Sequence, residues 1–132
     1  MSKLETQLTR QYWERVGGTL IEEFLIVHGS KKSAKRLTDG LIILGGERKI
    51  SRRTEVEIDG KDIIIVQTKH GRIGMYLLGQ VLFSKLLVEK NFRPRSVKSV
   101  ALCTKGDLEL ETIVSKQFPD IEIVVLDLLK NK

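Results

Sequence analysis

Apolar positions follow two different periods along this chain, one near its start and another through its middle. Over residues 3–16 an apolar side chain recurs at every fourth position, which places all of them on one face of an α-helix. The pattern therefore predicts a helix over residues 3–16 that ends at Gly17-Gly18. The stripe consists of Leu4, Leu8, Tyr12 and Val16.

Continuous apolar stretches of strand length follow. Thr19–Val27 is largely apolar, with β-branched residues flanking Glu22 and Glu23, and it predicts a first strand. His28–Arg36 is rich in Gly, Ser and Lys and predicts a loop. Leu37–Leu44 predicts a second strand, closed by a turn at Gly45-Gly46.

A two-residue turn signal, Asp59-Gly60, separates two further segments. Charged and apolar residues alternate over Glu55–Ile58, and Asp62–Lys69 follows the turn, so the arrangement predicts a β-hairpin. Every position of Ile63–Val66 is apolar. We therefore expect this strand to be buried on both faces and central in its sheet.

Helices and strands alternate in the second half of the chain. A helical pattern covers Arg72 to about Asn91 and is apolar on more than one side. Val97–Cys103 predicts a strand, Asp107 caps a short helix that ends near Phe118, and Ile121–Leu126 predicts a last strand. The predicted order is α-β-β-β-α-β-α-β, an α/β fold with a central mixed sheet flanked by helices. Turns join the first three strands, which argues against a dinucleotide-binding fold.

Length and composition are those of one small folded domain. The 132 residues suffice for one domain, and no apolar run exceeds four residues, so no membrane contact is expected. The polar N-terminus does not resemble a secretion signal. Cys103 is the sole cysteine, which excludes a disulfide framework and a cysteine-based zinc site. A cytoplasmic location is the expectation.

Charge placement changes the picture more than composition does. Between His28 and Arg53, eight basic residues face only Asp39 and Glu47, so this window equals the whole net charge of +6. Such a local excess suits a polyanionic partner, although a solvated basic surface is the plain alternative. The basic residues are Lys31, Lys32, Lys35, Arg36, Arg48, Lys49, Arg52 and Arg53.

Three polar residues interrupt apolar strands where burial makes them costly. Asp39 lies at the entry to the strand ending at Leu44, while Gln67 and Lys69 end the strand that begins at Asp62. Gln67 and Lys69 are two apart and so share a face. If the two strands are neighbours, a carboxylate, an amide oxygen and an ammonium converge. Mg²⁺ accepts such oxygens together with water, and a lysine beside the ion can stabilise charge on phosphate.

An Asp, a hairpin, then Gln67-x-Lys69 at the end of a buried strand and a long helix resemble the PD-(D/E)XK, restriction-endonuclease-like nuclease superfamily. The family core, α-β-β-β-α-β, matches residues 3–103, leaving an additional C-terminal helix and strand. The resemblance implies that Asp39 and Gln67 bind Mg²⁺ or Mn²⁺ and that Lys69 is the catalytic lysine. Thr38 stands where the family has proline, and Gln67 replaces the commoner glutamate.

The family often adds an acid from its first helix to the catalytic set. Glu14 lies on the predicted element and is favoured here, while Glu22 and Glu23 remain alternatives. Gln80 resembles a helix glutamine that some members of the superfamily use near the site. Arg72 and Tyr76 are close in sequence and suit contacts to phosphate or a base, against ordinary helix packing for Tyr76 and Gln80.

Three functions follow as hypotheses. The first is a metal-dependent endonuclease acting on nucleic acid, with DNA favoured over RNA, and with Lys31, Lys32, Lys35, Arg36, Arg72 and Gln80 binding the substrate. The second is the same fold as a catalytically decayed accessory subunit, and the third is an unrelated α/β interaction protein. Surplus apolar surface on the helix from Arg72 to Asn91 predicts a homodimer.

Overall fold

Side-chain caps begin two of the three helices in the computed structural model, which describes residues 1–128. Helix α1 (Lys3–Val16) begins with a capping box between Ser2 and Glu5, and Gly17, at φ 81°, ends it. Helix α2 spans Met75–Asn91, and α3 spans Leu108–Gln117. Asp107 caps α3 by accepting from the Leu110 backbone N–H at 3.1 Å. The helices at 3–16 and after Asp107 are confirmed, and α2 begins three residues later than predicted.

A mixed six-stranded sheet runs in the order β5-β1-β4-β6-β7-β8. Strands β1, β4 and β6 form an antiparallel meander, while β7 and β8 continue the sheet parallel to β6, and β5 pairs parallel with β1. The predicted mixed central sheet is confirmed. Its strands are β1 (Thr19–Glu22), β4 (Gly40–Ile43), β5 (Lys49–Ser51), β6 (Asp62–Arg72), β7 (Ser96–Lys105) and β8 (Ile121–Val125).

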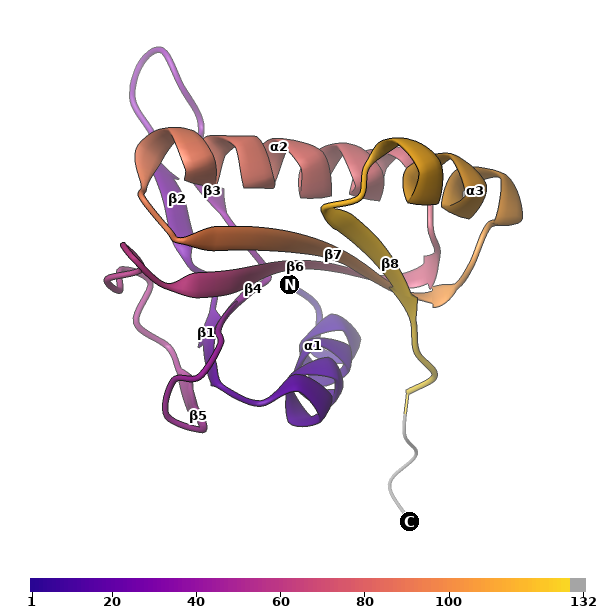
Figure 1. Cartoon of the computed structure of the whole chain (residues 1–132), viewed down its shortest axis with the longest axis horizontal. Helices are drawn as coiled ribbons and strands as arrows, with labels where there is room; N and C mark the ends of the chain where they lie inside the picture. Colours follow the sequence, from indigo (N-terminus) through magenta and orange to yellow (C-terminus); the bar gives the residue numbers. More distant parts are fainter. Residues whose placement is uncertain (129–132) are drawn as a thin grey trace.

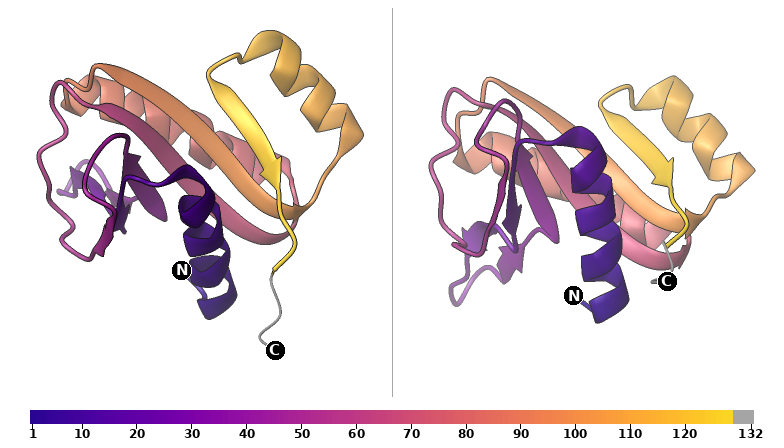
Figure 2. Two further views of the ribbon diagram at one scale, coloured as in Figure 1. Left: turned by 60° about the horizontal axis from the view of Figure 1, so that its bottom comes forward. Right: turned by 90° about the horizontal axis from the view of Figure 1, so that it is seen from below.

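Helices cover both faces of the sheet (Figure 1). Helix α1 packs Leu8, Tyr12 and Trp13 against one face, and α2 and α3 lie on the other. The turned views in Figure 2 show α3 and β8 together at one side of the molecule. Strand β6 lies between β4 and β7, and residues 63–68 are all buried. Its central, doubly covered place is thus confirmed.

A short antiparallel hairpin of β2 (Leu25–His28) and β3 (Lys35–Leu37) forms a separate two-stranded sheet. The predicted single strand Thr19–Val27 is wrong, because Glu23 adopts a positive φ of 59° and divides it. The predicted loop His28–Arg36 and strand Leu37–Leu44 are also wrong in extent. Thr38 and Asp39 belong to no strand and separate β3 from β4.

The predicted hairpin around Asp59-Gly60 is wrong. The turn exists, but residues 55–58 form no strand, and β6 pairs with β4 and β7 instead. Ile58 is fully buried in the cluster with Ile63, so its segment packs by its side chain and not by a strand ladder. Within residues 1–128, no helix is long and apolar enough to span a membrane.

Candidate functional site

Asp39 lies just before β4, where the chain leaves the hairpin and enters the sheet. Asp39 is the residue before Gly40, which pairs with Val66 at the end of the β4–β6 ladder. The Asp39 carboxylate oxygen Oδ2 accepts a hydrogen bond from the Thr68 backbone N–H at 2.8 Å. The side chain thus takes the place of a backbone acceptor and extends the β4–β6 ladder. The carboxylate is therefore held at the end of the sheet beside β6.

Gln67 bridges Asp39 to helix α2. Its Oε1 accepts from the Asp39 backbone N–H at 3.2 Å, and its Nε2 donates to Ser84 Oγ at 2.8 Å. Both Gln67 and Ser84 are buried. Because an amide oxygen has two lone pairs, one acceptor position of Gln67 remains beside Asp39. The structure therefore brings the Gln67 amide to the backbone of Asp39. That the Asp39 carboxylate and the Gln67 amide oxygen converge stays a prediction.

A second buried contact ties β6 to the opposite helix. Thr68 Oγ1 and Thr9 Oγ1 are 2.7 Å apart, and Thr9 Oγ1 also lies 2.8 Å from the Glu5 carbonyl oxygen. Sequence reasoning missed Thr9, Thr68 and Ser84. The signal was a small hydroxyl residue inside an apolar strand or helix, where burial demands a partner.

Burial dominates the electrostatics of Asp39. Desolvation raises the pKa of its carboxyl, and the Thr68 N–H opposes that shift by stabilising the anion. Negative charge on Glu5 and on Glu23 raises the pKa further, and the N-terminal amino group lowers it. The site therefore holds a carboxylate whose negative charge is poorly compensated by the protein.

Lys69 follows two residues after Gln67 and is exposed. It pairs in register with Cys103, whose side chain packs on the α2 side of the sheet, so Lys69 faces that side too. Among residues 1–128 its ammonium has no hydrogen-bond or ion-pair partner. Lys69 thus presents an uncommitted positive charge on the α2 side of the strand end that carries Gln67. It is not among the charges that act on Asp39, so the convergence of Lys69 with Asp39 stays a prediction.

The acids considered from sequence lie in different places. Glu14 is exposed near the C-terminal end of α1, and its carbonyl oxygen accepts from Arg48 at 3.4 Å. Glu22 is held by Arg10 through two hydrogen bonds of 2.7 and 2.9 Å. Glu23 is nearer the site, because its backbone N–H donates to the Asp39 carbonyl oxygen at 3.4 Å.

Glu5 is a helix acid that the sequence reasoning did not consider. It lies four residues before Thr9, hence on the same face of α1, whereas Glu14 is rotated about 140° from Thr9 at 100° per residue. Of these two helix acids, Glu5 and not Glu14 is the one whose charge acts on Asp39. The spacing of Glu5 from the buried Thr9 could have indicated it only if the Thr9 contact were known.

Asp39 and Gln67 carry oxygen atoms of the kind that can bind a hard cation. Within the described part of the chain, no three His, Cys, Asp or Glu side chains form a metal-binding group. Asp39 Oδ1 accepts no hydrogen bond from any described residue, and Gln67 Oε1 retains a lone pair. Mg²⁺ is commonly bound through one or two carboxylates and several waters, so these oxygens suit it.

The basic window divides into two parts. Arg48 stacks over Trp13 at 4.9 Å, Lys49 contacts Glu47 at 3.2 Å, and Arg52 lies 4.0 Å from Glu22. These cations belong to the surface near β5 and α1. The four hairpin cations, by contrast, make no ion pair with any described residue. They are Lys31, Lys32, Lys35 and Arg36.

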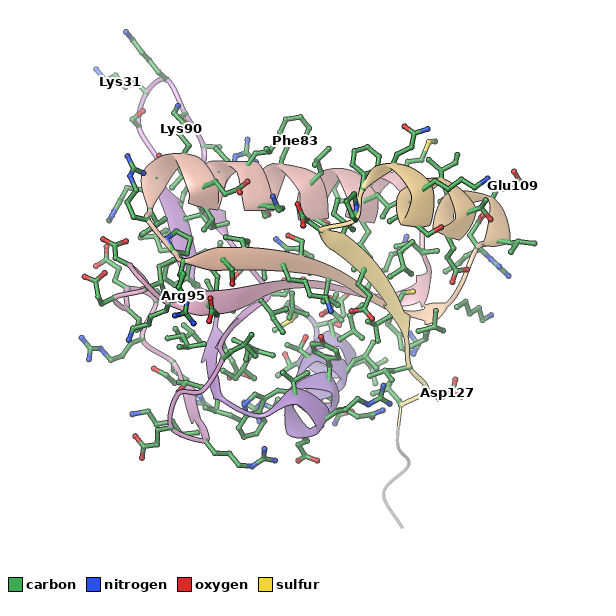
Figure 3. The ribbon with its side chains drawn as sticks, in the orientation of Figure 1. Lys31, Phe83, Lys90, Arg95, Glu109 and Asp127 are labelled. Atoms are coloured by element: carbon green, nitrogen blue, oxygen red, sulfur yellow. The ribbon has the colours of Figure 1, made fainter. Side chains whose placement is uncertain are left out.

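A groove of about 770 Å³ runs between β3 and α2. Lys35 and Arg36 line one wall, Tyr76, Gln80 and Phe83 line the other, and Gln67 and Ser84 also border it. In Figure 3, Lys31 lies at the end of the loop that projects from the hairpin, and Phe83 points outward from α2. The groove therefore joins the hairpin cations to the candidate site.

The other predicted contacts separate into two groups. Gln80 and Tyr76 are exposed in the groove, so the packing alternative for these two is wrong. Arg72 lies at the end of β6, where its Nη1 donates to the Gly106 carbonyl oxygen at 2.6 Å. The homodimer stays a prediction.

The chain matches no protein-family model, no curated protein and no solved structure. Its function is therefore argued from the site itself.

Proposed function

We propose that this chain is a metal-dependent endonuclease with a restriction-endonuclease-like core, acting on DNA or RNA. The observation that carries the proposal is the buried Asp39 carboxylate. It is fixed by the Thr68 backbone N–H. Gln67 contacts the Asp39 backbone N–H and Ser84 on α2, and Gln67 also borders the groove that Lys35 and Arg36 line. The resemblance to the nuclease superfamily is supported by the order of elements, in which α1 is followed by the strands β1, β4 and β6, then by α2 and β7.

Charge explains why such a site suits phosphodiester hydrolysis. The reaction adds water across a P–O bond, giving a phosphate monoester and an alcohol, and negative charge accumulates on the phosphate oxygens. Asp39 and the remaining lone pair of Gln67 would hold Mg²⁺, which when bound supplies positive charge to the phosphate and acidifies water. The rise in the Asp39 pKa supports this assignment, because a carboxylate poorly compensated by protein favours a cation.

Lys69 has the second role. Its ammonium is exposed and without a partner among the described residues, so it is available to bind a non-bridging phosphate oxygen and orient the attacking water. Gln67 acts mainly as a positioning residue, since its amide fixes the Asp39 backbone and is itself fixed by Ser84.

One observation favours the decayed accessory subunit as a second candidate. Both polar ends of Gln67 are engaged within the protein, and no group of three acidic or metal-binding side chains is found among residues 1–128. A single firm carboxylate ligand gives weak metal affinity. A protein that binds nucleic acid without cutting it would fit this arrangement.

Hydrolysis by the wild type and by Asp39→Asn separates the two functions. The amide retains an oxygen for the Thr68 N–H but removes the anion, so Mg²⁺-dependent cleavage should fall at least a hundredfold, about 2.7 kcal/mol, while nucleic-acid binding persists. Lys69→Ala should reduce turnover and spare metal binding. Lys61→Ala, an exposed lysine in the turn before β6, is the matched control and should change neither.

Gln67→Glu tests the metal site directly. A second carboxylate should tighten Mn²⁺ binding whether or not the natural protein is active. Isothermal titration calorimetry measures the Mn²⁺ affinity. Unchanged Mn²⁺ affinity would remove Gln67 from the site. A wild type that binds Mn²⁺ yet cuts neither DNA nor RNA in single-stranded, duplex or branched form would establish the accessory role instead.

A further inference from the structure

The outer face of α2 carries two aromatic rings that the core does not use. Tyr76 is 79% exposed and Phe83 is 62% exposed, and both line the groove. They are seven residues apart, so they lie within about 20° of each other around the helix. A buried aromatic contributes to packing, but rings this exposed contribute little. Their exposure needs another explanation.

Gly79 and the exposed Gln80 are the groove-lining residues between the two rings, and the surface at Gly79 is open. Gly79 lies between them on α2, and a Cβ added there would meet no atom within 4 Å. Seven residues of helix span roughly 10.5 Å. Bases stack about 3.4 Å apart along a strand, so the interval is long enough for two unpaired bases between the rings.

The charges on the two walls match a nucleic-acid strand. Lys35 and Arg36 line the β3 wall, whereas residues 75–84 of the α2 wall contain no charged residue. A nucleic-acid strand lying in the groove would therefore place its phosphates against β3 and its bases against α2. Aromatic platforms beside a basic track are how proteins hold single strands without reading their sequence.

A second copy of this chain is the competing occupant of the same apolar face. A two-fold contact through α2 would bring two basic hairpins close to the shared interface. Each hairpin carries four cations and no acidic residue over 29–37. Like charges at an interface oppose association, whereas a polyanion neutralises them.

We propose that the groove between β3 and α2 binds an unpaired stretch of nucleic acid, with bases on Tyr76 and Phe83 and phosphates on Lys35 and Arg36. This inference rests on the proposed function and specifies its substrate: DNA or RNA with single-stranded segments, such as tails, flaps or branch points. The groove reaches Gln67, so the unpaired segment would lead to the candidate site.

The test compares binding of a short oligothymidine, a blunt duplex and a duplex with a single-stranded tail, by fluorescence anisotropy without divalent cations. Tyr76→Ala and Phe83→Ala should each weaken oligothymidine and tailed-duplex binding about tenfold. Tyr76→Phe keeps the ring and should bind as the wild type does. Leu108→Ala is the matched control, because Leu108 is also 79% exposed but lies on α3, outside the groove.

Three results would overturn the inference. Tyr76→Ala and Phe83→Ala could leave oligothymidine binding unchanged, or they could weaken the blunt duplex as much as the tailed one. Sedimentation could instead show that the two substitutions convert a dimer to a monomer while the oligothymidine affinity per chain is unchanged. The exposed face of α2 would then be a dimer interface. The proposed function fails separately, if the wild type binds these oligonucleotides but Mg²⁺ and Mn²⁺ support no cleavage.

Discussion

Asp39 and Asp62 stand at opposite ends of one stretch of paired strand and experience opposite electrostatics. Burial raises the pKa of Asp39, whereas hydrogen bonds from Arg95 and Ser96 lower that of Asp62 to about 2. A carboxyl whose pKa is raised by folding stabilises the protein below its ordinary value of 3.8, and this contribution is lost as the pH rises through the folded value. A lowered pKa has the reverse effect, and its contribution is lost as the pH falls from 3.8 toward 2.

Asp39→Asn should therefore stabilise the protein at neutral pH in the absence of divalent cations. It removes a desolvated charge and keeps an acceptor for Thr68, so a rise in Tm of roughly 1–4 °C is expected. Mg²⁺ should raise the Tm of the wild type but not of the variant. Scanning calorimetry at several pH values measures both effects.

Asp62→Asn is the control at the far end of the strand. It should lower the Tm at neutral pH, because it loses the Arg95 ion pair, while the response to Mg²⁺ stays intact. If Asp39→Asn lowered the Tm at pH 7, or kept the full Mg²⁺ response, the carboxylate would not be the cation ligand.

Thr38 stands where the motif that the sequence resembles has proline, and its backbone makes a bond that proline cannot make. Its backbone N–H donates to the Phe24 carbonyl oxygen at 2.9 Å, a bond that proline cannot make. Among the residues that the structure describes, however, its hydroxyl is buried without a hydrogen-bond partner, as is that of Ser99. The backbone of Thr38 is therefore needed, and the hydroxyl is a cost.

Thr38→Val should stabilise the fold by about 1 kcal/mol, because it removes an unsatisfied hydroxyl and keeps the shape. Thr38→Pro should destabilise it by a similar or larger amount, since the Phe24 bond is lost. Urea denaturation measures both. Ser99→Ala removes the other buried hydroxyl, away from the site, and should stabilise as well. Destabilisation by Thr38→Val would mean that this hydroxyl has a partner in solution.

At the scale of elements, the strand end that carries the site is tethered to helices on both sides. Gln67 contacts Ser84 on α2, and Thr68 contacts Thr9 on α1. Ser84→Ala leaves the Gln67 amide without its acceptor in a buried place, so a loss of about 1–3 kcal/mol in unfolding free energy is expected. Ser115→Ala, on the exposed surface of α3, should cost little. Equal losses from the two changes would show that the tether carries no stability.

Elements whose signals are local could be predicted from the sequence, and those set by distant partners could not. The ends of α1 and the cap of α3 depend on Ser2, Gly17 and Asp107, which act within a few residues. The hairpin at Asp59-Gly60 was mispredicted because both edges of β6 are taken by β4 and β7, which pair over long sequence separations. No local sequence pattern indicates that β4 and β7, and not residues 55–58, pair with β6.

The candidate site divides in the same way. The strand entry at Asp39 and the two-residue spacing of Gln67 and Lys69 are visible in sequence, and the contact of Asp39 with Gln67 follows once β4 and β6 are neighbours. The positions of Glu5 and Glu14 relative to Asp39 depend on how α1 crosses the sheet. Helical periodicity fixes which face a residue occupies, but not where along a sheet that face rests.

At the scale of the whole molecule, four cations without an ion pair among the described residues gather on one projecting hairpin. Replacing Lys31, Lys32, Lys35 and Arg36 together by Ser should weaken binding to nucleic acid and flatten its salt dependence by about 0.7–0.9 in logarithmic slope per lost phosphate contact. Anisotropy titrations over a range of salt concentrations give the slope.

An equally large change in charge elsewhere is the control. Arg15, Lys61, Lys98 and Lys116 lie outside the hairpin and the groove, and their joint replacement by Ser removes the same four charges. If both quadruple variants flattened the slope equally, binding would report net charge alone and the hairpin would have no special role.

One continuous segment, residues 35–43, belongs both to the hairpin and to the central sheet, with Asp39 at the junction. A nucleic-acid strand bound along β3 and a cation bound at Asp39, as proposed, would therefore restrain the same few backbone torsions. Each ligand that orders this junction lowers the entropy that the other must lose, and thermodynamic reciprocity makes the gain identical in both directions. Substrate would thus raise the apparent affinity for the ion, so the metal site would fill mainly when there is nucleic acid to cut.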